Sequence, residues 1–158
     1  MRIWKLALVV LLVIPVFGYS EYEQKTGPEI EFIDFVKQDN LGSNLTSFSY
    51  RIAKTMQTYK IIVGKVGKDK ASEIVDKELN NSISKYQEQW DSNLGIAHSQ
   101  HITKLEINSL YYNGEKSPYF KKRKNLQKKI GDSMKELSEL LLEKVVSEAM
   151  QNAYAKVQ

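Results

Sequence analysis

Apolar residues recur every three or four positions along most of the chain after residue 28, the spacing that puts them on one face of an α-helix. Pro28 starts the first predicted helix, and Asn40-Leu41-Gly42 ends it with residues that tolerate a left-handed backbone. Ser43 or Asn44 caps a second helix that reaches Gly64. No stretch alternates apolar and polar residues long enough to predict a strand, so the expected fold class is all-α.

Two shorter-range signals define the middle of the chain. Asp69 caps a third helix, whose apolar spacing lasts until Ala97 to His101 interrupts it. Thr103 and Glu106 have the spacing of a capping box, in which each side chain bonds the backbone N–H of the other residue. This box predicts a short fourth helix that ends at Asn113-Gly114.

The last apolar pattern is the longest. Ser117-Pro118 places a cap and a first-turn proline before it, and the pattern continues to Val157. A straight helix of this length would measure about 60 Å, whereas a compact chain of this size has a radius of gyration of about 14 Å. We therefore expect a kink, with the break at Gly131-Asp132-Ser133, because glycine weakens a helix and Asp or Ser can cap a new one. The whole pattern predicts a compact bundle of about five helices that forms one domain over residues 29–158.

The common spacing also predicts the core. A chain of this length buries well over half its unfolded surface and needs no metal or disulfide to fold, which agrees with the absence of cysteine. Without cysteine, thiol nucleophiles, Cys-ligated zinc and iron–sulfur clusters are excluded. The residues expected to be mainly buried are Leu45, Ile52, Met56, Ile74, Leu79, Ile83, Tyr86, Trp90, Leu110, Met134, Leu137, Leu141 and Val145.

The first 20 residues have the three parts of a secretory signal peptide: a basic start, an uncharged run from Leu6 to Phe17, and the small residues Gly18 and Ser20. The uncharged run is shorter than the roughly 20 residues that span a bilayer. We expect cleavage after Ser20 and export to a bacterial periplasm, because a small eukaryotic secreted domain more often carries disulfides. Residues 21–28 are polar and predict a flexible lead-in.

Candidate catalytic chemistry is sparse. His98 and His101, three positions apart, could supply two ligands of a zinc site. No third potential ligand has the sequence spacing typical of such a site, so surface imidazoles are the favoured interpretation. Residues 64–68 lack the spacing and the Ser or Thr of a phosphate-binding loop. Carboxylate pairs such as Glu136 with Glu139 are what a solvated helix face produces by default. We therefore expect a non-enzymatic protein with no catalytic, metal or cofactor site.

Charge is the strongest local anomaly. Residues 116–129 contain seven Lys or Arg and no acidic residue, although the whole chain has a net charge of only +4, two units of which lie in the first 20 residues. Such a cluster beside tyrosines predicts contact with an acidic protein or with an anionic membrane surface, whereas the alternative is a solvated helix face. Nucleic acid is not expected as a partner of an exported chain with so small a charge. The candidate partner-binding residues are Tyr111, Tyr112, Tyr119, Lys121, Lys122, Arg123, Lys124 and Lys128.

Several of these features follow one another in a recognisable order between residues 100 and 130: Ile102-Thr103, Glu106-Ile107, Leu110, Tyr111-Tyr112, Ser117-Pro118 and Lys121-Lys122. In this order they resemble a bacterial periplasmic family catalogued as domain of unknown function 2059. The chain departs from the family pattern by the four residues 113–116 between the aromatic pair and Ser-Pro, and by Phe120 near the place of a glycine. The resemblance implies an α-helical exported domain and no defined activity.

Three hypotheses of function follow. The first is a non-enzymatic protein of the bacterial cell envelope that binds another protein through a helical face, favoured by the basic, tyrosine-flanked helix start. The second is a periplasmic immunity protein that blocks an antibacterial toxin, which an adjacent toxin gene would identify. The third is a hydrolase that uses carboxylates or the two histidines, for which a pocket with convergent Glu or His side chains is required.

Overall fold

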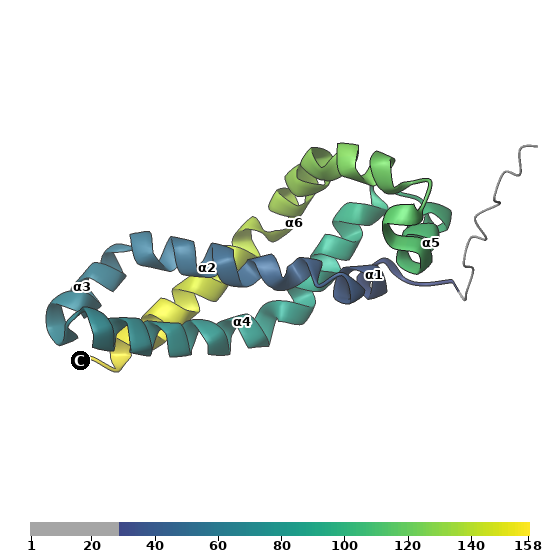
Figure 1. Cartoon of the computed structure of the whole chain (residues 1–158). Coiled ribbons are helices and arrows are strands. Elements are labelled where there is room, and N and C mark those ends of the chain that lie inside the picture. The colour runs from purple at the N-terminus through teal and green to yellow at the C-terminus, as the bar shows by residue number, and fades with distance from the viewer. Residues whose placement is uncertain (1–28) are drawn as a thin grey trace, which may run out of the picture.

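The computed structural model describes residues 29–158, which are almost entirely helical and include no strand (Figure 1). The helices pack compactly, so the expected all-α fold is confirmed. The predicted signal peptide and lead-in lie outside the described residues. The α-helices are α1 (Phe32–Gln38), α2 (Asn44–Thr55), α3 (Gln57–Val66), α4 (Lys68–Ser99), α5 (Lys104–Asn113) and α6 (Phe120–Ala155), with 3-10 turns η1 (Leu41–Ser43) and η2 (Gly114–Lys116).

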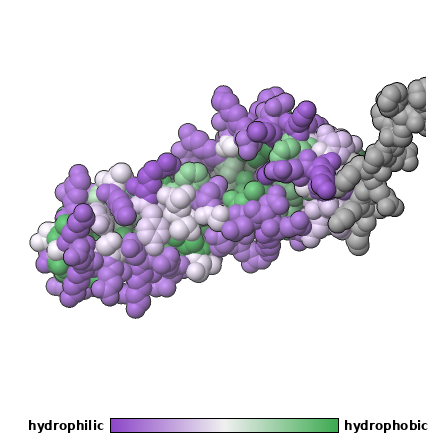
Figure 2. All heavy atoms as spheres, viewed as in Figure 1, coloured by the Kyte–Doolittle hydropathy of each residue, from purple (hydrophilic) through white to green (hydrophobic). Residues whose placement is uncertain are grey.

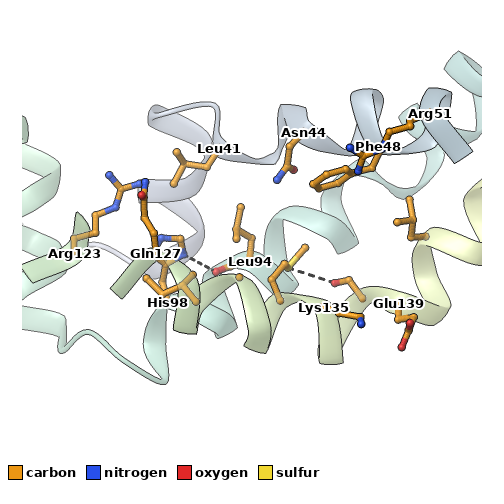
Figure 3. Close-up of a pocket in the computed structure, with 15 residues that line it drawn as sticks. Leu41, Asn44, Phe48, Arg51, Leu94, His98, Arg123, Gln127, Lys135 and Glu139 are labelled. Carbon is orange, nitrogen blue, oxygen red and sulfur yellow. Dashed lines mark hydrogen bonds between the residues drawn. The ribbon is translucent and has the colours of Figure 1, made fainter. Parts of the chain in front are cut away.

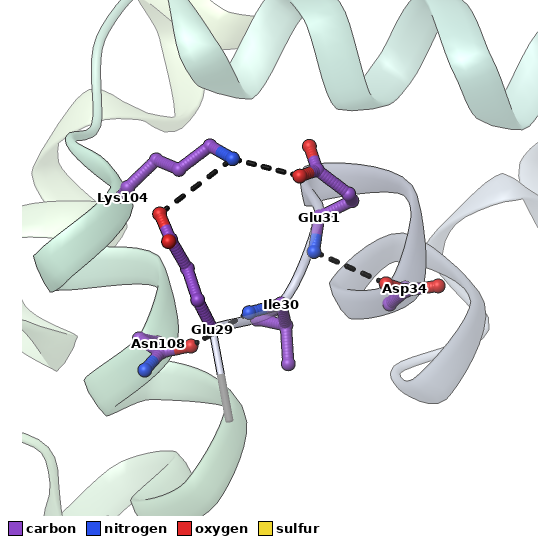
Figure 4. Close-up of polar contacts among 6 residues, drawn as sticks. All are labelled: Glu29, Ile30, Glu31, Asp34, Lys104 and Asn108. Atoms are coloured by element: carbon purple, nitrogen blue, oxygen red, sulfur yellow. Dashed lines mark hydrogen bonds and ion pairs between the residues drawn. The ribbon is translucent and has the colours of Figure 1, made fainter. Parts of the chain in front are cut away.

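The start of α1 is fixed by polar contacts, several of them with α5 (Figure 4). The Asp34 carboxylate accepts the backbone N–H of Glu31 at 3.1 Å, so the helix begins directly after Glu31, and the predicted start at Pro28 is wrong. From α5, Lys104 lies 2.7 Å from the Glu31 carboxylate, and Asn108 accepts the N–H of the residue before Glu31 at 3.0 Å. These bonds attach the entering chain to a helix more than 70 residues away in the sequence.

The single helix predicted between residues 44 and 64 is two helices. Met56 adopts an extended backbone with φ −70° and ψ 146°, which separates α2 from α3. The Thr55 hydroxyl donates to the Ile52 carbonyl at 2.7 Å, and a side chain that bonds the preceding turn in this way competes with the helical backbone. The break turns the chain, and Ile52 is 36% exposed, so its predicted burial is wrong.

Helix α4 is longer at both ends than the pattern predicts. It begins after Gly67, whose φ of +83° suits glycine, and Asp69 lies in the first turn instead of capping it. It continues to Ser99, past the interruption predicted at residue 97, because Ala97 and His98 are both buried against neighbouring helices. Tertiary packing therefore extends the helix through a segment in which the apolar residues no longer have helical spacing.

Helix α5 begins and ends where the sequence predicts. The Thr103 backbone N–H donates to the Glu106 carboxylate at 3.0 Å, and the Glu106 N–H donates to the Thr103 hydroxyl at 3.3 Å. The helix ends at Asn113, before Gly114 with its φ of +55°. The capping box is thus confirmed, since both of its bonds form within four residues.

Helix α6 starts at Phe120, later than the predicted cap at Ser117, and runs without interruption to Ala155. The break predicted at residues 131–133 is wrong, and Figure 1 shows a continuous helix that curves along its length. Ile130 and Met134, one turn apart on either side of Gly131, are both buried, so packing holds one helix face through the glycine.

Helices α4 and α6 are antiparallel and form the long axis of the molecule, with the shorter helices packed on them (Figure 1). Several polar contacts fix their register. Among them, the Ser82 hydroxyl donates to the Val145 carbonyl at 2.8 Å, the Asn93 amide donates to the Leu137 carbonyl at 3.1 Å, and Lys156, directly after α6, pairs with Glu78. Within the described residues, no helix is long and apolar enough to cross a membrane.

Most of the predicted core is confirmed. Met56 and Ile74 are half-buried, and Leu137 is 38% exposed, so its predicted burial is wrong. The apolar stripe of α6 is wider than the face that α4 covers, which leaves Leu137 at its margin. The predicted residues that are buried are Leu45, Leu79, Ile83, Tyr86, Trp90, Leu110, Met134, Leu141 and Val145.

Candidate functional site

A groove of about 620 Å³ lies between α2 and α6, with α4 at its base. Figure 2 shows it as a hollow in which hydrophobic residues are exposed between hydrophilic ones. Figure 3 shows side chains from η1, α2, α4 and α6 around the same space. The apolar lining consists of Leu41, Phe48, Leu94, Ile130, Met134 and Leu142, and the polar lining of Asn44, Arg51, His98, Arg123, Gln127, Lys135, Ser138 and Glu139.

The α2 wall of the groove is held by Trp90, which is buried in α4. Its indole N–H donates to the Asn44 side-chain oxygen at 2.8 Å, and its ring meets Phe48 edge to face at 6.3 Å between centroids. Asn44, Phe48 and Arg51 are spaced by four and three residues, so they share one face of α2. This wall is therefore fixed by packing before any partner binds.

Arg123 lies at one end of the groove, on the α6 wall (Figure 3). Its guanidinium carbon is 5.0 Å from the centroid of the Phe35 ring, a cation–π contact. Its Nε is buried and has no hydrogen-bond partner in the described part of the chain. Burial lowers the pKa of Arg123, although an arginine remains charged at neutral pH. The groove thus contains a cation with an unused donor.

His98 forms part of the base beside Arg123. The favoured sequence interpretation of His98 as a surface imidazole is wrong, because its ring is buried and meets Phe35 edge to face at 5.7 Å. Nδ1 lies 2.8 Å from the Leu94 carbonyl, which fixes Nδ1 as the protonated nitrogen of the neutral ring. Burial is the largest cause that lowers the pKa of His98, and the positive charge of Arg123 lowers it further. The hydrogen bond with the Leu94 carbonyl acts in the opposite direction and raises it.

We expect His98 to make the protein less stable in mild acid. Because its pKa in the folded state is below the unfolded value of 6.5, the unfolded chain gains the proton first as the pH falls through 6.5. Stability is therefore complete above pH 6.5 and declines below it, toward the lower folded pKa. Urea unfolding at a series of pH values measures this slope, and His98→Phe should flatten it. An equal slope in the variant would assign the decline to other groups.

The rim of the groove is mainly basic. Arg51 stands on the α2 side, 5.3 Å from the Phe48 ring centroid, and Lys135 stands on α6, where Glu139 is the one carboxylate in the lining. Lys124 and Lys128 are exposed and precede Lys135 at helical spacing, so they extend the same edge of α6 toward its N-terminus. Cations therefore stand on both sides of the apolar floor.

The structure distributes the predicted binding residues over different surroundings. Lys121, Lys124 and Lys128 are exposed on α6, whereas Lys122 pairs with Glu106 at 2.6 Å and Arg123 enters the groove. The three tyrosines are half-buried against the core, and the rings of the first two pack edge to face at 5.0 Å. These three side chains are Tyr111, Tyr112 and Tyr119.

Sequence reasoning missed the α2 wall, His98 and Gly131 as parts of a site. The spacing of Asn44, Phe48 and Arg51 signals a shared face, but nothing local indicates that this face meets α6. His101, half-buried, bonds the Ser133 hydroxyl at 2.9 Å and does not line the groove. Among the described residues, no three His, Asp or Glu side chains are grouped as metal ligands.

Fold and groove together define a class: an all-α protein with an open, basic-rimmed apolar groove between two helices. Comparison with protein-family models, with curated proteins and with solved structures found no match to this chain. The resemblance of residues 100–130 to the periplasmic family therefore rests on its motif residues alone and stays a prediction.

Proposed function

We propose that this chain is an exported, non-enzymatic protein of the bacterial cell envelope that binds another protein in the groove between α2 and α6. The observation that carries the proposal is an open groove with an apolar floor, bounded by cations on both helices. Burial of apolar surface supplies affinity, and the charged rim supplies selection among partners. The location in the envelope is supported by the signal-like residues 1–20.

The extent of the groove favours a protein over a small ligand. From Arg123 to Leu142, the α6 wall is about 28 Å long at the usual rise of about 1.5 Å per residue. Small-molecule sites are concave and bury most of a drug-sized ligand, whereas a groove open along two helices suits a segment of another protein. A toxin-blocking role would be one case of this binding, with the toxin as the partner.

Filling the groove tests this proposal. A Cβ at Gly131 would meet no neighbouring atom within 4 Å, and Gly131 lines the groove, so Gly131→Trp should fold and place its indole there. We expect photo-cross-linking and co-purification from the native envelope to recover a partner with the wild type and to lose at least about 90% of it with Gly131→Trp, a tenfold effect of the size seen when one central interface contact is removed.

The matched control adds the same indole elsewhere on α6. Leu140 is exposed and does not line the groove, so Leu140→Trp should retain the partner. Equal recovery with both tryptophan variants, or no cross-linked protein with the wild type, would contradict binding in the groove. Circular dichroism of both variants checks that each remains helical.

A further inference from the structure

Gly131 is an unusual residue for the middle of a long helix. Glycine inside a helix costs about 0.5–1 kcal/mol relative to alanine. Nothing in the fold requires it, because Gly131 has an ordinary helical conformation and no atom lies within 4 Å of where its Cβ would stand. Gly95, in contrast, faces the α1 backbone, 3.2 Å from the Ile33 nitrogen. The missing side chain at Gly131 therefore opens the groove and lets a backbone approach α6 closely.

The cations of the groove stand at both of its ends. Figure 3 places Arg123 at one end and Arg51 at the other, with Lys135 between them on α6. An anionic lipid carries its charge in a single headgroup, so it can satisfy cations at one end only. A partner that carries several carboxylates along its length can meet all three cations. The charge distribution therefore favours an acidic polypeptide over a single amphiphile.

The floor of the groove decides the conformation of that polypeptide. An extended segment laid on Phe48, Leu94 and Met134 would present backbone N–H and C=O groups to side chains that cannot bond them. In a helix the same groups bond one another, and apolar residues at positions i, i+4 and i+7 can fill the floor. A helix therefore avoids the desolvation cost that an extended segment would carry.

We propose that the occupant of the groove is an acidic amphipathic helix of the partner protein, packed across Gly131 with its carboxylates on Arg51, Arg123 and Lys135. This inference rests on the proposed function, because it names the element of the partner that enters the groove. Arg123, which lines the groove, offers its guanidinium to a carboxylate of the helix in this arrangement. Gly131 is the point of closest approach between the two helices.

Two synthetic helical peptides test the charge preference directly. Each has about 16 residues with leucines at i, i+4, i+7 and i+11, and one carries Glu and the other Lys at the flanking positions. Fluorescence anisotropy with the purified exported chain measures both dissociation constants. We expect the Glu peptide to bind at least about tenfold more tightly, with a difference that shrinks as salt is added. Equal affinity of the two peptides, or no binding of either, would overturn the inference.

Variants of the chain make the test specific to the groove. Gly131→Trp should weaken binding of the Glu peptide at least about tenfold, whereas Leu140→Trp should leave its dissociation constant unchanged, because only the first substitution fills the groove. Replacing both Arg51 and Lys135 by Glu should reverse the preference toward the Lys peptide. Retained preference in the double variant would overturn the inference, as would tighter binding of palmitate or of anionic vesicles at the same site.

The failure of this inference is distinguishable from that of the proposed function. If the native partner is lost with Gly131→Trp but the peptides show no charge preference, a protein binds in the groove by another element. If Gly131→Trp retains the native partner, binding in the groove fails, and the proposed helix fails with it.

Discussion

Leu141→Ala should lower the free energy of unfolding by about 2–5 kcal/mol, whereas Leu140→Ala should change it by less than about 0.5 kcal/mol. The two leucines are adjacent on α6, but Leu141 is 7% exposed in the core and Leu140 is 81% exposed. Truncating Leu141 removes buried apolar atoms and leaves a cavity that the neighbouring helices fill only in part. Urea unfolding followed by circular dichroism measures both variants.

The pair is a matched comparison because both substitutions make the same chemical change in the same helix. Alanine has slightly higher helix propensity than leucine, so a purely local effect would be equal and small at both positions. Equal losses at Leu140 and Leu141 would mean that the face of α6 assigned to the core is wrong. An unchanged midpoint for Leu141→Ala would mean that this face points to solvent or to a second chain.

Local signals predicted the parts of the fold that local bonds determine. The Thr103 and Glu106 box and the end of α5 at Asn113 follow from bonds within a few residues, and both are present. The break at Met56 is accompanied by a local bond, from the Thr55 hydroxyl to the Ile52 carbonyl, that the apolar spacing does not reveal. The continuity of α6 through Gly131 depends on packing between helices far apart in the sequence. A single glycine costs a helix about 1 kcal/mol, which burial of its neighbours on either side exceeds.

The candidate site was predicted in part, for the same reason. A run of cations such as Lys121, Lys124 and Lys128 is visible in any reading of the sequence, and these three are exposed on α6. That Arg123 turns inward to the Phe35 ring depends on α1, which precedes it by more than 80 residues. The opposing wall around Phe48 is also far from α6 in the sequence, so no local pattern could predict that the two walls face each other.

Gly95→Leu should lower the free energy of unfolding by about 1–3 kcal/mol or more, because it overpacks the contact between α4 and α1. A Cβ at this position would stand 3.2 Å from the Ile33 nitrogen and 3.4 Å from the Phe32 carbonyl carbon. Both atoms belong to the backbone of α1, which cannot move aside as a flexible side chain can. Urea unfolding measures the loss, and a neutral result would mean that α1 is not seated on α4.

The contrasting variant is Gly131→Ala, whose effect on stability should have the opposite sign. It gains about 0.5–1 kcal/mol from the lower backbone entropy of the unfolded chain and meets no neighbour within 4 Å. A loss of stability in this variant would show that the fold itself requires glycine at residue 131. If stability rises while affinity for the Glu peptide falls, the glycine costs the fold stability and improves binding, which is the trade-off expected where a residue serves a site.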